Sequence, residues 1–147
     1  MAQTFHAEAR LRVRYAETDQ MGVVYHANYL VWFEVGRVEL LRSLGIPYKQ
    51  LEEEHGRMIA VVGAEVRYRA PARYDDEIAV RTSLLAMRGP VLKIGYQVVR
   101  VSDGKLLCDG KTTHVVVDRQ MTKQSLPEPY LRVFQGLLRD TSTVDDA

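Results

Sequence analysis

The sequence predicts an α+β domain in which an antiparallel sheet packs against one central helix. Three patterns support this fold class. Residues 8–15 alternate between apolar and charged, residues 29–44 form a helical segment that is apolar nearly all round at its start, and four strand-like runs with short connections follow. A helix without a polar face is wrapped by other structure, so it belongs in the middle of the domain.

The long helix is predicted from Tyr29 to Leu44 by its apolar residues and by signals at both ends. Asn28 is a residue type that caps helix N-termini, and Gly45 followed by Pro47 is the stop signal expected just past a helix end. Pro47 also fits the first position of a short second helix, which Gly56 would end.

The rest of the chain is mostly strand-like, with turn residues between the runs. The predicted strands after the helices are Met58–Ala70, Glu77–Met87, Val91–Val101 and Lys105–Val117, and the first strand is Glu8–Tyr15. Asp103-Gly104 is expected to supply the two left-handed positions of a tight hairpin, which would pair the last two strands antiparallel. Leu126-Pro127 then opens a final helix with Tyr130 and Phe134 on its apolar side.

Length and composition indicate one domain over residues 1–147, because 147 residues with 46% hydrophobic content can build one sizeable core. No internal repeat or linker divides the chain, and residues 140–147 are expected to form a disordered polar tail. Twenty Lys and Arg against 19 Asp and Glu give a formal net charge of +1. No global field would therefore draw the protein to nucleic acid or to an anionic membrane.

The expected location is the cytoplasm, and this expectation rests on missing signals for any other destination. The first dozen residues carry only Phe5 and Leu11 as large apolar side chains, unlike a signal peptide. No apolar run approaches the roughly 20 residues that span a bilayer. The single cysteine, Cys108, cannot form an internal disulfide and is expected to be a small buried thiol in a strand.

The segment between the first strand and the long helix, residues 14–29, mixes acids, glycine, histidine and aromatics. Asp19 lies just upstream of a helix N-terminus, where unpaired backbone N–H groups and the helix dipole supply positive potential. A carboxylate can attack or activate water while N–H donors hold the charge that develops on a carbonyl oxygen, which is what acyl transfer needs. By residue type alone, a turn or capping carboxylate is the more frequent use of such an aspartate.

Two further residues of this segment carry polar groups that can serve the same chemistry. His26 can orient water, donate to a thioester carbonyl or pair with Asp19, or else serve only as a local hydrogen-bond partner at the helix start. Tyr15, at the end of the first strand, can place a hydroxyl near the loop, although its pattern fits a tyrosine at the edge of the core. Gly22 most simply allows a tight turn.

Tyr15, Thr18-Asp19 and the run from Gly22 to Tyr29 together resemble the signature of the 4-hydroxybenzoyl-CoA thioesterase family, especially its YbgC-type acyl-CoA thioesterase branch. A second stretch, Val66–Tyr68 followed by Pro71–Glu77, is similar to the segment that this family carries before its third strand. The likeness extends over most of residues 8–130. It implies the hot-dog fold, a five-stranded antiparallel sheet wrapped around a long central helix.

The resemblance also implies roles for individual residues. Asp19 matches the catalytic carboxylate, and the backbone N–H at His26 matches the group that polarises the thioester carbonyl, with the His26 and Tyr15 side chains assisting. Such proteins assemble as dimers, often tetramers, with each active site shared across a subunit interface. Glu17 stands where many members carry a second aspartate, so the resemblance implies no role for it.

The phosphates of coenzyme A require a local cluster of Lys or Arg. Arg88, beside a Gly-Pro turn, and Lys123, after the last strand, are candidates, with solvated surface charges as the alternative. The histidines show no paired metal-ligand spacing, and the nucleophile-elbow, phosphate-loop and dinucleotide motifs are absent. The sequence therefore implies no cofactor, since coenzyme A belongs to the substrate.

These observations predict hydrolysis of an acyl-CoA to free acid and coenzyme A, with Asp19 as general base or nucleophile. Two alternatives remain open: a hot-dog enoyl-CoA hydratase or dehydratase, and a non-catalytic acyl-thioester-binding protein. The sequence does not distinguish short aliphatic, long aliphatic and aromatic acyl groups. It also leaves open whether the carrier is free coenzyme A or a phosphopantetheine protein.

Overall fold

The structure is a computed structural model that describes residues 5–145, with side chains described up to Arg139. Its elements in chain order are β1 (Ala7–Arg12), the 3-10 helix η1 (Tyr15–Glu17), α1 (Asn28–Ser43), α2 (Tyr48–His55), β2 (Met58–Tyr68), β3 (Glu77–Arg88), β4 (Val91–Arg100), β5 (Leu106–Val117) and α3 (Glu128–Asp145).

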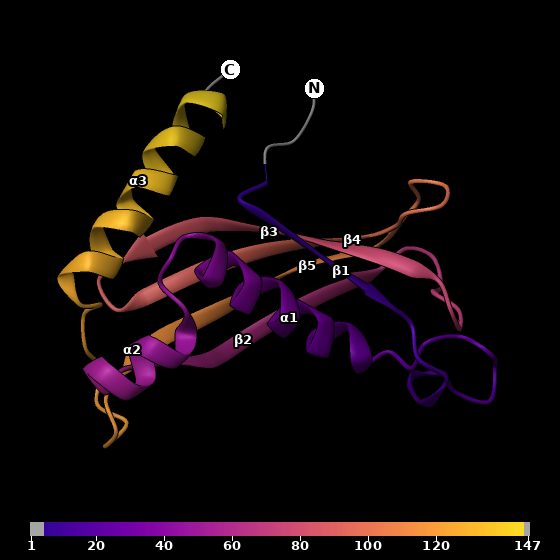
Figure 1. Ribbon diagram of the computed structural model, residues 1–147, viewed down its shortest axis with the longest axis horizontal. Coiled ribbons are helices and arrows are strands. Elements are labelled where there is room, and N and C mark those ends of the chain that lie inside the picture. Colours follow the sequence, from indigo (N-terminus) through magenta and orange to yellow (C-terminus); the bar gives the residue numbers. More distant parts are fainter. Residues whose placement is uncertain (1–4, 146–147) are drawn as a thin grey trace.

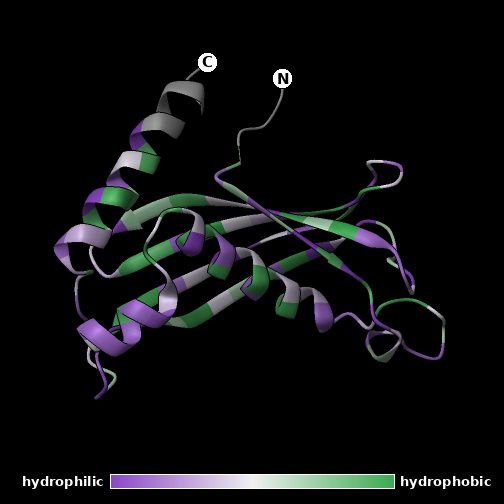
Figure 2. Ribbon diagram, viewed as in Figure 1, coloured by the Kyte–Doolittle hydropathy of each residue, from purple (hydrophilic) through white to green (hydrophobic). Residues whose placement is uncertain are grey.

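The five strands form one sheet in the order β1-β3-β4-β5-β2, and every neighbouring pair is antiparallel. The sheet curves around α1, which crosses its concave face, so the α+β hot-dog prediction is confirmed (Figure 1). Hydrophobic residues run along the strands and α1 where they face each other (Figure 2). Because β1 and β2 form the two edges, the order leaves β2 with a neighbour on one side only.

Helix α1 is held close to the sheet by small residues at two points. A Cβ at Gly36 would collide with the side chains of Thr82 and Val80, and a Cβ at Gly110 would collide with the ring of Phe33. Phe33 stacks on Tyr96 with ring centroids 4.2 Å apart. The helix packs mainly against β1, β3 and β4, which leaves the β2 side of the concave face less covered.

The chain leaves the first strand earlier than predicted, because β1 ends at Arg12 and Tyr15 begins a 3-10 turn. The cause is Glu17, whose carboxylate accepts a hydrogen bond from the Arg14 N–H at 2.8 Å and closes that turn. The N-cap prediction is also wrong. Ala27 caps α1, while the Asn28 side-chain amide donates to the Glu17 carbonyl at 2.8 Å.

Two turn predictions also need correction. Pro47 is the N-cap of α2, one residue before its first position, whereas Gly56 ends the helix in the left-handed region as predicted. The Asp103-Gly104 hairpin is wider than a two-residue turn, because only Gly104 is left-handed and the Arg100 N–H bonds to the Lys105 carbonyl. Antiparallel pairing of β4 with β5 is confirmed.

Helix α3 closes one end of the domain. Tyr130 and Phe134 are buried in the core, as predicted, and the helix packs against β3. Its backbone is helical to Asp145, so it overlaps the tail predicted from residue 140, and residues 146–147 lie outside the described part. Within residues 5–145, no helix is both long enough and apolar enough to cross a membrane.

Candidate active site

The loop between β1 and α1 is a compact turn built on its own backbone. The Asp19 N–H donates to the Val23 carbonyl at 2.9 Å, and the Gly22 N–H donates to the Asp19 carbonyl at 3.0 Å. Gly22 has φ of +80°, a left-handed conformation that other residues rarely adopt. The predicted role of Gly22 in a tight turn is therefore confirmed, and the turn fixes where Asp19 stands.

Glu17 anchors this loop to the central helix. Its side chain is only 4% exposed, and its second carboxylate oxygen accepts a hydrogen bond from the Trp32 indole at 2.8 Å. Its backbone carbonyl accepts bonds from the Tyr25 N–H and the Asn28 amide. Sequence reasoning assigned Glu17 no role. The available signal was Trp32, an indole N–H in an apolar helix that needs a buried acceptor.

Asp19 differs from Glu17 in having one carboxylate oxygen unused. Oδ1 accepts a hydrogen bond from the Met21 N–H at 2.9 Å, as in an ordinary Asx turn. Among the described residues Oδ2 has no hydrogen-bond partner, and the side chain is partly exposed. The turn bond fixes the orientation of the carboxylate and leaves one oxygen able to react.

The helix start next to this loop carries unpaired donors. Within the described part of the chain, the backbone N–H groups of His26 and Ala27 have no acceptor, as expected at a helix N-terminus. The His26 carbonyl accepts a hydrogen bond from the Tyr68 hydroxyl at 3.0 Å. Burial raises the pKa of Tyr68, which keeps its hydroxyl protonated as a donor. Tyr68 therefore ties β2 to the start of α1.

The structure does not join the three predicted side chains into one hydrogen-bonded set. The His26 ring is exposed and lies 4.4 Å from that of Tyr25, centroid to centroid. Tyr15 is 79% exposed and packs edge-on against Tyr74 at 5.6 Å, so it is not at the core edge. No hydrogen bond among the described residues links Tyr15, Asp19 and His26.

Arg88 and Lys123 lie at the far end of the sheet from Asp19. Glu77 pairs with Arg12 beside the loop, whereas Arg88 is the last residue of the same 12-residue strand. At about 3.3 Å per residue such a strand is about 35–40 Å long. Lys123 pairs with Val117 at that distant end. Neither side chain is therefore placed next to Asp19 of its own chain.

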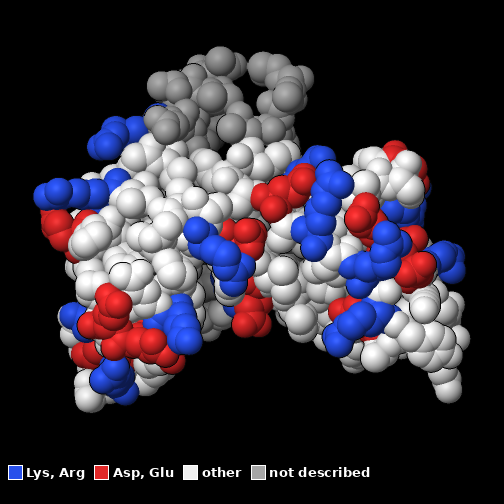
Figure 3. Space-filling model, viewed as in Figure 1, with Lys and Arg blue, Asp and Glu red and all other residues white. Residues whose placement is uncertain are grey.

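Other arginines lie nearer the loop. Arg67 is the last but one residue of β2, and Arg73 lies in the connection from β2 to β3. Both are exposed, and neither side chain has an ion-pair partner in the described part of the chain. Figure 3 shows Lys and Arg interspersed with Asp and Glu over one face, consistent with the near-neutral total charge. A phosphate would therefore be held by individual Lys or Arg side chains and not by a broad positive surface.

Two buried titratable groups take no part in this site. Cys108 is buried as predicted, and burial raises the pKa of its thiol to about 12, so it is a poor nucleophile. Burial lowers the pKa of His114 to about 4, and its Nε2 lies 2.6 Å from the Thr112 hydroxyl. No three His, Cys, Asp or Glu side chains of the described residues converge where they could hold a metal ion.

Comparison with known proteins places this loop and fold in a family. The chain matches the model of the thioesterase-like superfamily over residues 13–134. The Bacillus subtilis protein YneP is 38% identical over 117 residues, covering 80% of this chain and 83% of that protein. The acyl-CoA thioester hydrolase YbgC of Escherichia coli strain CFT073 is 34% identical over 126 residues, covering 85% and 92%.

A solved structure agrees with these relatives. The crystal structure of a hypothetical protein from Thermus thermophilus superposes with a TM-score of 0.82 at 38% identity, covering 88% of this chain and 98% of that one. The chain belongs to the thioesterase-like superfamily.

Proposed function

We propose that the protein hydrolyses an acyl-CoA thioester to a free acid and coenzyme A, with Asp19 as the reacting carboxylate. The observation that carries this proposal is that one short segment holds both the unused Oδ2 of Asp19 and the unpaired N–H groups of His26 and Ala27. An anionic nucleophile or base and an oxyanion site are the two components that acyl transfer needs. The names of the relatives point to the same substrate class.

The reaction uses only groups of the protein, the substrate and water. Asp19 either attacks the thioester carbonyl carbon, giving an anhydride that water opens, or removes a proton from a water that attacks instead. The His26 N–H stabilises the oxyanion in both routes. When water attacks, the C–S bond breaks and the thiolate takes the proton that Asp19 removed from the water. When Asp19 attacks, the thiolate leaves as the anhydride forms, and the water that opens the anhydride supplies its proton. The His26 imidazole and the Tyr15 hydroxyl assist by orienting water and substrate. No cofactor takes part, and the reaction is placed in the cytoplasm.

The active form is a homodimer, which in turn can pair into a tetramer. β2 is an edge strand, so one row of its backbone N–H and C=O groups lacks a strand partner among residues 5–145. Val61 and Val62 on this strand are 50% and 61% exposed, and Val31 and Val35 of α1 are also exposed. Two copies that pair antiparallel along β2 cover both the open edge and this apolar surface.

This arrangement also provides cations for the coenzyme A phosphates. Antiparallel pairing places the Tyr68 end of each β2, next to His26, beside the Met58 end of its neighbour. Met58 pairs with Val117, which in turn bridges to Lys123. Arg88 and Lys123 therefore act from the neighbouring subunit, and Arg67 and Arg73 act from the subunit that holds Asp19.

The test is thiol release from acyl-CoA substrates by the wild type and by Asp19→Asn. Losing an acid-base group typically costs about 10²- to 10⁴-fold in rate, so kcat should fall by that factor while the unfolding temperature is unchanged. If the wild type releases thiol only at the background rate, the thioesterase proposal fails, and the hydratase and the acyl-thioester-binding protein remain as alternatives. Wild-type turnover by Asp19→Asn would remove Asp19 from the mechanism.

Light scattering with Ala64→Pro on β2 tests the dimer, because proline removes a backbone donor from the strand.

A further inference from the structure

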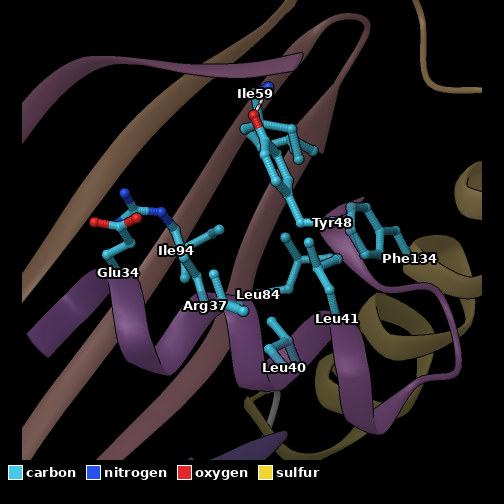
Figure 4. A pocket seen from close by; sticks show the side chains of 11 residues that line it. Glu34, Arg37, Leu40, Leu41, Tyr48, Ile59, Leu84, Ile94 and Phe134 are labelled. Atoms are coloured by element: carbon cyan, nitrogen blue, oxygen red, sulfur yellow. Dashed lines mark hydrogen bonds between the residues drawn. The ribbon is translucent and has the colours of Figure 1, made fainter. Parts of the chain in front are cut away.

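A cavity of about 120 Å³ lies between the C-terminal half of α1 and the sheet, at the end of the molecule away from Asp19 (Figure 4). Its walls come from the helices α1, α2 and α3 and from the strands β2, β3 and β4. Tyr48 of α2 lines the cavity, and six of the other lining residues are buried and apolar: Leu40, Leu41, Leu84, Leu92, Ile94 and Phe134. Only Glu34 and Arg37 bring charge to the wall.

The lining indicates an apolar ligand. A void of this kind leaves the surrounding side chains without van der Waals partners, so an empty cavity destabilises the fold. A cavity lined by leucine, isoleucine and phenylalanine stays dry and takes up hydrocarbon, and one of about 150 Å³ accepts benzene. By that scale, this cavity accommodates an apolar group of about four to six carbons.

The two charged residues argue against an anionic group on the ligand. Glu34 and Arg37 are three residues apart on α1, a spacing that places opposite charges on one face of a helix, and both side chains line the cavity (Figure 4). A carboxylate entering beside Arg37 would also meet Glu34. An uncharged hydrocarbon end avoids that repulsion, so an aliphatic chain fits the cavity better than a dicarboxylic acyl group.

The position of the cavity relates it to the catalytic loop of the other subunit. Ile59, in the cavity wall, is one residue from the start of β2, whereas Tyr68, at the end of β2, bonds to His26 of its own chain. Within one chain, cavity and loop therefore lie at opposite ends of this strand. The proposed antiparallel pairing along β2 brings the cavity of each subunit to the loop end of its neighbour.

We infer that the cavity of one subunit receives the apolar end of an aliphatic acyl chain whose thioester carbonyl lies at Asp19 of the neighbouring subunit. This inference rests on the proposed function and names its substrate class as medium-chain aliphatic acyl thioesters. Leu84 and Tyr48 set the accepted chain length, Leu84 from β3 at the base and Tyr48 from α2 at the wall.

The first experiment measures thiol release from acetyl-, butanoyl-, octanoyl- and dodecanoyl-CoA. Leu84→Phe fills the cavity, so its kcat/KM for octanoyl-CoA should fall by about tenfold or more while that for acetyl-CoA stays within about twofold. Tyr48→Ala opens the wall and should shift the preferred chain to a longer one. Ile78→Phe is the matched control, since Ile78 is equally buried on β3 but is not in the cavity wall.

Equal loss on all four substrates, or an unchanged chain-length profile in Leu84→Phe and Tyr48→Ala, would overturn the inference and leave the thioesterase activity standing. Decanoate binding supplies a second readout without catalysis. The free acid should raise the unfolding temperature of the wild type but not of Leu84→Phe. If the wild type releases no thiol and decanoate still protects it, the proposed function fails and the apolar site remains.

The assignment across the interface has its own test. Asp19→Asn and Leu84→Phe subunits are mixed, dissociated and reassembled, and octanoyl-CoA hydrolysis is measured. If the cavity serves the neighbouring Asp19, each mixed dimer contains one intact site, and random reassembly restores about a quarter of wild-type activity. If loop and cavity belonged to the same chain, no intact site would form, and activity at the level of the unmixed variants would refute the assignment.

Discussion

Glu17 and Asp19 are two carboxylates on one loop, two residues apart, and the fold treats them in opposite ways. Glu17 is buried, and its two oxygens accept hydrogen bonds from the Arg14 N–H and the Trp32 indole. Asp19 is partly exposed and has a single bond, from the Met21 N–H to Oδ1. The buried acid is saturated with donors, while the partly exposed one keeps an oxygen for other chemistry.

This difference separates an acid that positions the loop from the acid that we propose reacts with the thioester. A carboxylate whose two oxygens both accept hydrogen bonds from the protein has no oxygen left to meet a substrate or a water molecule. Glu17 serves by joining the loop to α1, through its side chain to Trp32 and through its carbonyl to Asn28. Asp19 stands where it does because Glu17 holds the preceding turn.

The largest expected effect on stability comes from Glu17→Ala. It leaves the buried indole N–H of Trp32 without an acceptor and removes the part-buried bond from the Arg14 N–H. A buried unsatisfied group costs about 1–3 kcal/mol and a lost hydrogen bond about 0.5–1.5 kcal/mol, so the free energy of unfolding should fall by about 2–4 kcal/mol. Asp19→Ala removes one hydrogen bond at a partly exposed site and should cost at most about 1 kcal/mol. Urea denaturation of both variants compares them. Similar losses would mean that the two acids do not differ in structural role.

The pH dependence of stability tests whether His114, a buried group outside this loop, stays uncharged in the folded protein. Burial lowers the pKa of His114 to about 4, against an ordinary value near 6.5. Between these values the unfolded chain binds the proton and the folded one does not, so stability falls as pH drops from about 6.5 to 4. The loss approaches about 3 kcal/mol below pH 4 and is absent above pH 7.

Unfolding measured in urea between pH 4 and 7 checks this, with His114→Gln as the comparison because glutamine has no proton to gain. The wild type should lose stability relative to the variant across that window. Parallel pH profiles of the two proteins would show that His114 does not carry the dependence.

The sequence could predict what depends on local pattern. Hydrophobic period located the strands and α1, and the motif around Asp19 and His26 indicated the reacting loop. The structural role of Glu17 was not predicted, because it depends on the hydrogen bond from the Trp32 indole, and Trp32 faces Glu17 only after α1 has folded back on the loop. Burial of an acid is decided by tertiary packing, and residue spacing alone does not show it.

Tertiary structure also decides two other positions that the sequence did not predict. Arg88 was chosen for the turn beside it, and the direction of β3 puts that turn at the end of the sheet opposite Asp19 of the same chain. The Asp103-Gly104 turn widened because the Asp103 carboxylate accepts from the Arg100 side chain and the Lys105 N–H, at 2.8 Å and 3.0 Å. These bonds reach beyond the dipeptide that suggested a tight hairpin.

The smallest expected effect comes from Tyr68→Phe, which tests whether the Tyr68 hydroxyl is needed to hold the N–H groups of His26 and Ala27 in position. The Tyr68 hydroxyl donates to the His26 carbonyl at 3.0 Å, and removing it frees the start of α1, whose N–H groups we propose bind the thioester carbonyl. A hydrogen bond of this kind contributes about 0.5–1.5 kcal/mol, so kcat should fall about two- to tenfold with KM nearly unchanged. Tyr74→Phe is the control, since Tyr74 is similarly exposed and its hydroxyl makes no hydrogen bond among the described residues. Equal effects of the two variants on kcat would show that the helix start is positioned without Tyr68.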